Sequence, residues 1–213
     1  MFGRLFSKSS GGTAEEYFRR ASRYCNRKKR EFNFGLAIEH FKEAIKLNPG
    51  NSKYHGELAR AYVAAPLWAV TRGIGDEVSL EQCLHFGIEE ALEAIRLHQE
   101  YMEAYLISGE AHMYRGDNQK AVEAFQSILE LSAGPFFSGS FLTDRFIKSF
   151  ARRELEHFGR GEGQPDVARE HIERAISCRD EEKYRLAHGE LAKALRLAPD
   201  RSWLYETICE ILG

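Results

Sequence analysis

The 213-residue sequence has few of the residues that mark disulfide-rich, zinc-binding or membrane-spanning proteins. Its four cysteines, Cys25, Cys83, Cys178 and Cys209, lie far apart, and none belongs to a Cys-x-x-Cys pair. This spacing favours reduced thiols in an intracellular protein over a disulfide framework or a zinc site. No segment approaches the roughly 20 uninterrupted apolar residues that a membrane-spanning helix needs. The N-terminal segment lacks the apolar core of a secretory signal, so we expect a cytoplasmic location.

Proline is also scarce, with five residues in the whole chain. A proline inside a helix removes a backbone hydrogen bond and clashes with the preceding turn. We therefore expect all five, Pro66 among them, to lie in connections between helices or directly after a helix. The sequence between them is free to form uninterrupted helices.

The sequence contains no local pattern that is typical of a catalytic or metal-binding site. Glu154 and His157 form a single Glu-x-x-His pair, whereas a di-iron site in a helical bundle needs two such pairs. Gly159, Gly161 and Gly163 follow no predicted strand and precede no Lys-Ser/Thr, so they indicate a linker and not a phosphate-binding loop. We therefore expect a protein that is not an enzyme and that holds no metal ion and no cofactor.

Positive charge is concentrated at the beginning of the chain. Residues 1–30 contain nine Lys/Arg and two Glu, a net charge of +7, and the other residues carry a net charge of −9. The basic patch consists of Arg19, Arg20, Arg23, Arg27, Lys28, Lys29 and Arg30. It predicts either the solvated face of a first helix, which we favour, or a contact with an anionic surface. Because Phe2, Leu5 and Phe6 lie close by, the alternative that we retain is a peripheral membrane contact, and nucleic acid is not an expected partner.

One segment of the chain has a pattern of small and large residues that predicts a pair of packed helices. Gly109 and Ala121 are small at positions where two helices must approach closely, and Phe125 fills the space beside them. Between the helices, Gly116 can adopt a left-handed conformation, and Asp117 can cap the first amides of the next helix. The segment therefore predicts a helix, a two-residue break and a second helix.

This order of small and large residues resembles the tetratricopeptide repeat, a helix–turn–helix unit of 34 residues. The residue that opens the second half of the second helix recurs in the same register along the chain. It occurs as Ala44, Ala94, Ile128 and Ala194. Several copies in one register are a more specific signal than any single residue, and the resemblance covers about four fifths of the chain.

The resemblance implies an all-α fold, a right-handed helical solenoid of about four helix–turn–helix repeats. Before it we expect a flexible tail of residues 1–12, so that the solenoid spans residues 13–213. The expected repeats are residues 14–51, 52–101, 102–135 and 168–201. A helix at 202–212 is expected to close the open end of the stack.

Two segments depart from the regular repeat. The second repeat carries about sixteen extra residues, centred on 64–79, which we expect between its two helices. Residues 141–158 form an amphipathic pattern outside the register, so they are either an inserted helix or half of a degenerate repeat.

Members of this family hold partner polypeptides in a concave groove that is lined by the first helix of each repeat. The resemblance therefore implies a scaffold or adaptor that binds a segment of another protein, in a bacterial cytoplasm or at the inner face of a membrane. Carried over by position, the groove residues are Lys53, Arg60, Glu103, Leu106, Glu110, Met113, Tyr114, Ile172, Ile176 and Arg179.

Aromatic residues in or beside the expected loops are further candidates for partner contact. They are Trp68, Phe136 and Phe137. Such residues are common among binding hot spots, but they are equally typical of loops that cover the solenoid. One subset of the family grips the C-terminal carboxylate of heat-shock chaperones, and Glu57 and Arg60 stand where that subset has asparagine. We therefore do not expect chaperone tails as partners.

Overall fold

The computed structural model describes residues 12–26, 33–71, 77–131, 144–158, 165–181 and 183–197 together with Thr207, and no strand occurs within them. The helices in chain order are α1 (Ala14–Tyr24), α2 (Phe34–Leu47), α3 (Ser52–Thr71), α4 (Glu77–Leu97), α5 (Met102–Arg115), α6 (Asn118–Glu130), α7 (Asp144–Phe158), α8 (Pro165–Asp180) and α9 (Tyr184–Leu197). The predicted all-α fold is confirmed.

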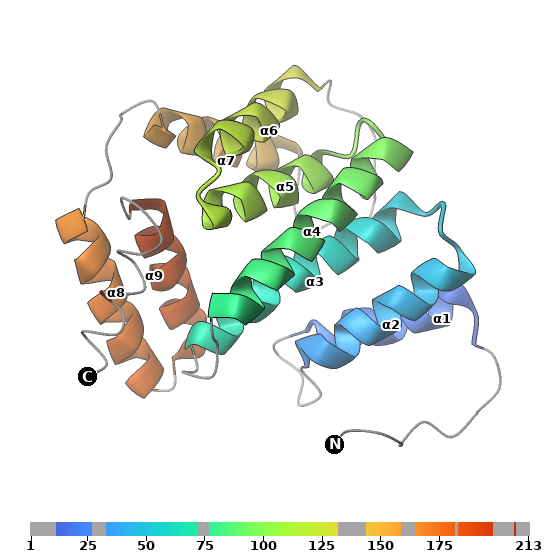
Figure 1. Cartoon of the computed structure of the whole chain (residues 1–213), viewed down its shortest axis with the longest axis horizontal. Helices are drawn as coiled ribbons and strands as arrows, with labels where there is room; N and C mark the ends of the chain where they lie inside the picture. The colour runs from blue at the N-terminus through green and yellow to red at the C-terminus, as the bar shows by residue number, and fades with distance from the viewer. Residues whose placement is uncertain are drawn as a thin grey trace.

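Consecutive helices pack as hairpins that are stacked along the chain (Figure 1). α1 packs on α2, α3 on α4 and α5 on α6, and contacts of α2 with α3 and of α4 with α5 join the hairpins. We call the first helix of each hairpin its A helix and the second its B helix. This arrangement is the solenoid of helix–turn–helix repeats that the sequence predicts.

Small residues recur at equivalent positions of the hairpins, where helices lie close together. In the A helices they are Ala21, Ala59, Gly109 and Ala175, and all four are buried. In the B helices they are Ala37, Gly87, Ala121 and Ala187, which are buried as well. At Gly109 the helices lie so close together that a Cβ atom would be 2.6 Å from Cε1 of Phe125. The recurrence of small residues therefore has a packing cause, because a larger residue at these positions would push the two helices apart.

Local signals set the beginning of two helices. Thr13 and Glu16 form a reciprocal capping box at the start of α1. The side chain of Asn33 accepts a hydrogen bond from a backbone amide in the first turn of α2. These interactions satisfy amides that have no partner inside the helix.

The break between α5 and α6 agrees with the prediction at one of its two residues. Gly116 ends α5 in the left-handed conformation, with φ at 85°. The prediction that Asp117 caps α6 is wrong, because its side chain makes no capping hydrogen bond. Its carboxylate instead accepts a hydrogen bond from Nε of Arg115 at 2.7 Å and lies 3.2 Å from Nδ1 of His112. A charged guanidinium is a stronger partner for a carboxylate than a backbone amide is.

The extra residues of the second repeat lengthen its helices. α3 continues to Thr71 and α4 begins at Glu77, so the expected long connection is wrong for most of the segment. Pro66 lies inside α3, which contradicts our placement of it between helices. Trp68 is accordingly a helical residue, although its side chain lies outside the described part.

α7 takes the place of the A helix of a further repeat. It packs on α6, the B helix before it, and touches α5, the A helix before it. In the same way, α5 packs on α4 and touches α3. Phe150 and Phe158 bring their rings to 6.2 and 6.4 Å from the ring of Phe125. Of the two alternatives for residues 141–158, these contacts favour half of a degenerate repeat.

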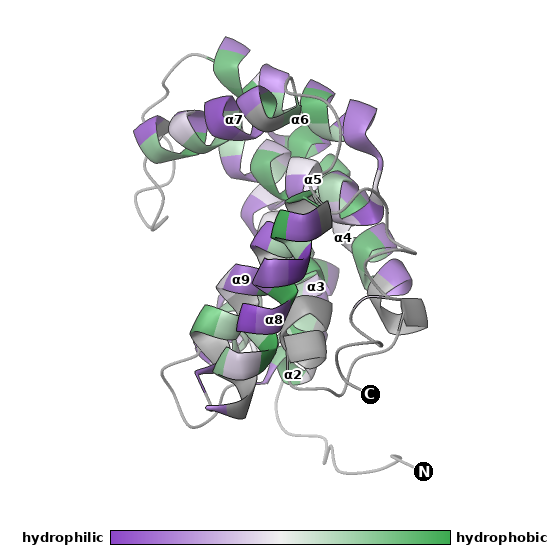
Figure 2. Ribbon diagram, turned by 90° about the vertical axis from the view of Figure 1, so that its left-hand side faces the viewer, coloured by the Kyte–Doolittle hydropathy of each residue, from purple (hydrophilic) through white to green (hydrophobic). Residues whose placement is uncertain are grey.

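The α8–α9 hairpin returns to the earlier A helices. Its two helices pack on each other and are joined by a 2.7 Å contact between Nδ1 of His171 and Oε2 of Glu190. Its main neighbours outside the hairpin are α3, which touches both helices, and α5, which touches α9. In Figure 2 the hairpin lies in front of α3, and hydrophilic residues occupy much of the side that faces the viewer. Of the closing helix predicted at 202–212, only Thr207 is described, and it is buried.

The close approach at Gly109 leads to the first prediction. A Gly109→Ala substitution places a methyl group in the ring of Phe125, so we expect it to lower the free energy of unfolding by about 1–3 kcal/mol. Urea unfolding followed by circular dichroism measures this change.

Gly189→Ala is the matched control, because Gly189 also lies in a helix but a Cβ atom there would meet nothing within 4 Å. It should leave the free energy of unfolding unchanged or raise it by roughly 0.5–1 kcal/mol, the intrinsic preference for alanine in a helix. Equal effects of the two substitutions would show that the hairpin does not depend on the contact at Gly109.

Candidate functional site

The A helices and the B helices lie on different sides of the stack. α3 contacts α5 and α5 contacts α7, so the A helices touch one another across successive hairpins. Among the described residues, the B helices α2, α4 and α6 make little or no contact with one another. The stack is therefore closed up on the A side, which we call the inner face, and spread open on the B side.

Arg60 of α3 stands among carboxylates on the inner face. One of its terminal nitrogens lies 3.7 Å from Oε1 of Glu57. Burial lowers the pKa of Arg60, but the neighbouring charges of Glu57, Glu103 and Glu110 outweigh burial and raise it. Its Nε atom is buried and has no hydrogen-bond acceptor within the described part of the chain. An N–H group in that position is costly unless an acceptor reaches it.

Tyr101 borders the same group of charges at the start of α5. Burial, with the nearby carboxylates of Glu57 and Glu103, raises the pKa of the Tyr101 hydroxyl well above its ordinary value. Its ring also leaves no room for a side chain at Gly56, where a Cβ atom would lie 2.7 Å from the ring. The hydroxyl therefore stays protonated beside Arg60.

The structure divides the residues that the sequence assigned to one groove. Glu103, Leu106, Met113 and Tyr114 are each only 5–6% exposed. The last three belong to the main hydrophobic core, so they support the inner face and do not line its surface. Lys53 is half-buried and places its Nζ atom 5.3 Å from the centre of the Phe18 ring on α1. Among the predicted groove residues on α3 and α5, the partly accessible ones are Lys53, Arg60 and Glu110.

The residues predicted on the fourth repeat do not extend the α3–α5 surface in sequence order. Ile172 is 1% exposed and Ile176 is half-buried on α8, which packs against α9 and α3. The side chain of Arg179 lies outside the described residues. The hairpin therefore stands beside the inner face as a second wall.

The structure describes part of the predicted basic patch. Arg19 pairs with Glu15 at 3.1 Å, Arg20 lies 5.9 Å from the centre of the Tyr17 ring, and Arg23 is exposed. The positions of these three arginines agree with the solvated face of a helix. Arg27, Lys28, Lys29 and Arg30 lie outside the described residues, as do the hot-spot candidates Phe136 and Phe137.

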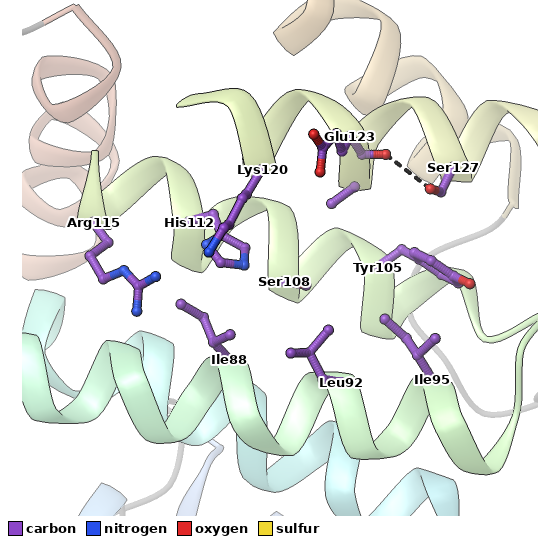
Figure 3. Close-up of a pocket in the computed structure, with 11 residues that line it drawn as sticks. Ile88, Leu92, Ile95, Tyr105, Ser108, His112, Arg115, Lys120, Glu123 and Ser127 are labelled. Atoms are coloured by element: carbon purple, nitrogen blue, oxygen red, sulfur yellow. Dashed lines mark hydrogen bonds between the residues drawn. The ribbon is translucent and has the colours of Figure 1, made fainter. Parts of the chain in front are cut away.

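A groove of about 410 Å³ opens on the B side, between α4 and α6 (Figure 3). One wall consists of Ile88, Leu92 and Ile95 on α4, whose side chains point toward α6. The opposite wall consists of Lys120, Glu123, Ala124 and Ser127 on α6. The floor is formed by α5, through Tyr105, Ser108 and His112, and Arg115 stands at one end. We call this feature the outer groove.

Two cationic side chains and a histidine gather at one end of the outer groove. His112, Arg115 and Lys120 lie together there, and Asp117 binds the first two. Burial lowers the pKa of His112, the hydrogen bond with Asp117 opposes it, and the charges of Arg115 and Lys120 lower it further. The net effect keeps the imidazole neutral near pH 7.

Sequence reasoning missed the outer groove. Ile88, Leu92 and Ile95 recur at the spacing of a stripe that packs into a core, and Ile88 is 6% exposed as that pattern predicts. Leu92, however, is 51% exposed. Periodicity alone does not separate these two residues, because both lie on the same side of the helix.

The described residues offer no other chemical centre. No group of three or more His, Cys, Asp or Glu side chains in the described ranges is placed to hold a metal ion, and the side chain of His157 lies outside them. The three described cysteines form no disulfide. None of the helices that could be searched is long and apolar enough to cross a membrane.

Comparison with known proteins gives distant similarities. No family model matches the chain. Serine/threonine-protein phosphatase 5 of Mus musculus is 25% identical over 118 residues, which are 55% of this chain and 20% of that protein. This chain therefore matches about a fifth of the length of that relative. A solved structure described as the first TPR of Spaghetti (RPAP3) bound to the HSP90 peptide SRMEEVD shares 17% identity, with a TM-score of 0.49, and the match covers 70% of this chain and 94% of that one.

The class of the protein follows from its own helices. Helical hairpins with buried small residues at equivalent positions, and with A helices in contact along one side, are typical of the tetratricopeptide-repeat fold. The chain therefore has an all-α, tetratricopeptide-repeat-like fold.

The environment of His112 leads to a prediction on the pH dependence of stability. The pKa of this group lies below its ordinary value of 6.5 in the folded chain, so the folded state binds fewer protons than the unfolded one. The contribution of His112 is fully present above the unfolded pKa and is lost as the pH falls through the folded pKa. When the pH is lowered from about 7 to about 5, we expect the free energy of unfolding to fall less in the His112→Gln variant than in the wild type.

His55 is the control, because its shift has the opposite sign. Burial lowers its pKa, but its contacts with Glu90 at 2.7 Å and with the carbonyl of Pro49 at 3.0 Å outweigh burial and raise it. Its contribution is present below the unfolded pKa and is lost as the pH rises through the folded pKa. His55→Gln should therefore change how the free energy of unfolding varies with pH as the pH rises through the folded pKa of His55. Urea unfolding at several pH values measures the stability of both variants. Identical profiles of unfolding free energy against pH would contradict the opposite signs of the two pKa shifts.

Proposed function

We propose that the chain is a non-enzymatic scaffold that binds a segment of a partner protein on its inner face. The observation that carries this proposal is the buried Nε–H group of Arg60, which has no acceptor within the described residues. The side chain of Arg60 is 38% exposed as a whole, so a rotation of the side chain would bring this N–H group to a carbonyl oxygen of a bound polypeptide. Hydrogen bonds that involve a charged group are stronger than neutral ones, so this contact would act as an anchor.

The charges around Arg60 define the kind of segment that fits. Glu57, Glu103 and Glu110 surround a single guanidinium, so this part of the inner face carries more negative than positive charge. A segment with a basic side chain next to the anchoring carbonyl complements it. An acidic tail such as the HSP90 peptide bound by RPAP3 does not, because its carboxylates would meet the three glutamates. The proposal therefore keeps chaperone tails outside the expected partners.

The α8–α9 hairpin gives the binding surface a second wall. It packs on α3 and reaches α5, the two helices that carry Arg60 and its carboxylates. A bound segment would lie beside this hairpin, so that one side of the segment meets α3 and α5. The limited access to Lys53, Arg60 and Glu110 agrees with a narrow site that selects an extended chain.

Replacement of the anchor tests the proposal. The tagged protein and its Arg60→Gln variant would be used to capture partners from soluble and membrane fractions of the source cells, and the affinity for the partner identified would then be measured. We expect Arg60→Gln to weaken binding about tenfold or more, because one charged hydrogen bond is lost.

Arg96→Gln is the matched control. Arg96 also pairs with a glutamate three residues earlier in a helix, but it lies on α4 and its side chain is 68% exposed. This variant should bind the partner as the wild type does, and circular dichroism should show the same helix content in both variants. If the two variants retain equal affinity, the partner does not use the inner face at Arg60.

A second function is favoured by the excess of positive charge in residues 1–30. The basic N-terminal region would tether the scaffold to an anionic membrane surface. Removal of residues 1–12 together with Arg27→Gln, Lys28→Gln, Lys29→Gln and Arg30→Gln should abolish co-sedimentation with vesicles that contain phosphatidylserine. Vesicles of phosphatidylcholine alone are the control. Unchanged sedimentation of the truncated variant would remove the tether from consideration.

A further inference from the structure

The exposed leucine on α4 points to a second binding surface. Leu92 is 51% exposed, although the residues one turn away on either side, Ile88 and Ile95, are buried or half-buried. We propose that the outer groove is a docking site for an amphipathic helical segment of a partner protein that carries an acidic side chain. This site is separate from the inner face and does not depend on the function proposed above.

The spacing of the groove residues fits a helical occupant. Along α4 the apolar wall repeats at Ile88, Leu92 and Ile95, and along α6 the polar wall repeats at Lys120, Glu123 and Ser127. Successive members of each row are one helical turn apart, and the two rows run along opposite sides of the groove (Figure 3). A helix laid between them would meet apolar side chains along one edge and polar ones along the other, as helix-in-groove recognition requires.

The floor of the groove limits how deeply an occupant can enter. Ser108 and His112 are 3% and 6% exposed, so α5 closes the groove beneath its two walls. The groove exists because α4 and α6 make little or no contact with each other in the described part of the chain, while both pack on α5. It therefore receives side chains from an occupant and not its whole backbone.

The charge at one end selects an acidic partner. Arg115 donates a hydrogen bond to the carboxylate of Asp117, which also lies beside Nδ1 of His112, so the charge of Arg115 is balanced within the chain. Lys120 is exposed and makes no ion pair with any of the described residues. Glu123, one turn further along the wall, accepts a hydrogen bond from Gln119 at 3.2 Å. A carboxylate of the occupant would therefore be placed beside Lys120, with its apolar residues directed toward Leu92 and Ile95.

Synthetic peptides test this surface without knowledge of the natural partner. The probes are four fluorescein-labelled helical peptides with leucines at i, i+4 and i+7. Each peptide also carries one glutamate, and its position shifts by one residue from one peptide to the next, so that the four peptides cover one helical turn. Four sister peptides carry lysine in place of the glutamate. Fluorescence anisotropy with the full-length chain measures their affinities. We expect at least one glutamate peptide to bind saturably and its lysine sister to bind at least fivefold more weakly.

Substitutions in the groove make the test specific. Leu92→Glu should weaken the best peptide at least tenfold. Leu47→Glu is the matched control, because Leu47 is 56% exposed on α2 and does not line the groove. Lys120→Glu should reverse the preference, so that the lysine sister binds more tightly than the glutamate peptide. Thermal unfolding would verify that the substitutions at these exposed positions leave the chain folded.

Several results would overturn the proposal. They are the absence of saturable binding for every peptide in the set, a preference of the wild type for the lysine peptides, and equal effects of Leu92→Glu and Leu47→Glu. Arg60→Gln should not change the affinity of the peptides, because Arg60 does not line the groove. Failure at the inner face and failure at the outer groove are therefore separate observations.

Discussion

Two helices can approach each other closely only where at least one of them carries a small residue, and this constraint organises the whole chain. The ring of Phe125 occupies the space where a side chain on Gly109 would begin. Buried alanine or glycine occupies the equivalent positions of the other hairpins. Each hairpin is therefore narrow, and the A helices of successive hairpins come into contact.

Contact on one side of the stack requires separation on the other. Because α3, α5 and α7 touch in succession, the outer helices α4 and α6 are held apart over the floor that α5 provides. The same packing thus creates an inner face with partly buried charges and an outer groove with an exposed leucine. The two surfaces differ in chemistry, since the first presents glutamates around Arg60 and the second presents a lysine beside apolar side chains.

Polar groups inside the stack carry energetic costs that the chain offsets in different ways. His55 joins α3 to Glu90 of α4 and to the carbonyl of Pro49, so both ring nitrogens have partners. Asp117 likewise binds both Arg115 and His112 at the break between α5 and α6. Arg60 differs, because its charge is balanced by carboxylates while its Nε–H group has no acceptor in the described part. Buried polar groups without a hydrogen-bond partner are uncommon in folded proteins, which sets Arg60 apart from these other groups.

The sequence by itself determined the helical hairpins, their register and the end of α5. These features depend on local pattern: apolar residues at helical spacing, small residues at close approaches, and a glycine that adopts positive φ at residue 116. Local pattern was misleading at Pro66, which lies inside α3, and at Asp117, because a guanidinium competed for the carboxylate. Only the tertiary structure decided that α8 and α9 return to α3, that Leu106, Met113 and Tyr114 are core residues, and that Leu92 borders an open groove. Those outcomes depend on which helices meet across long distances in the sequence, and such contacts leave no periodic signal along the chain.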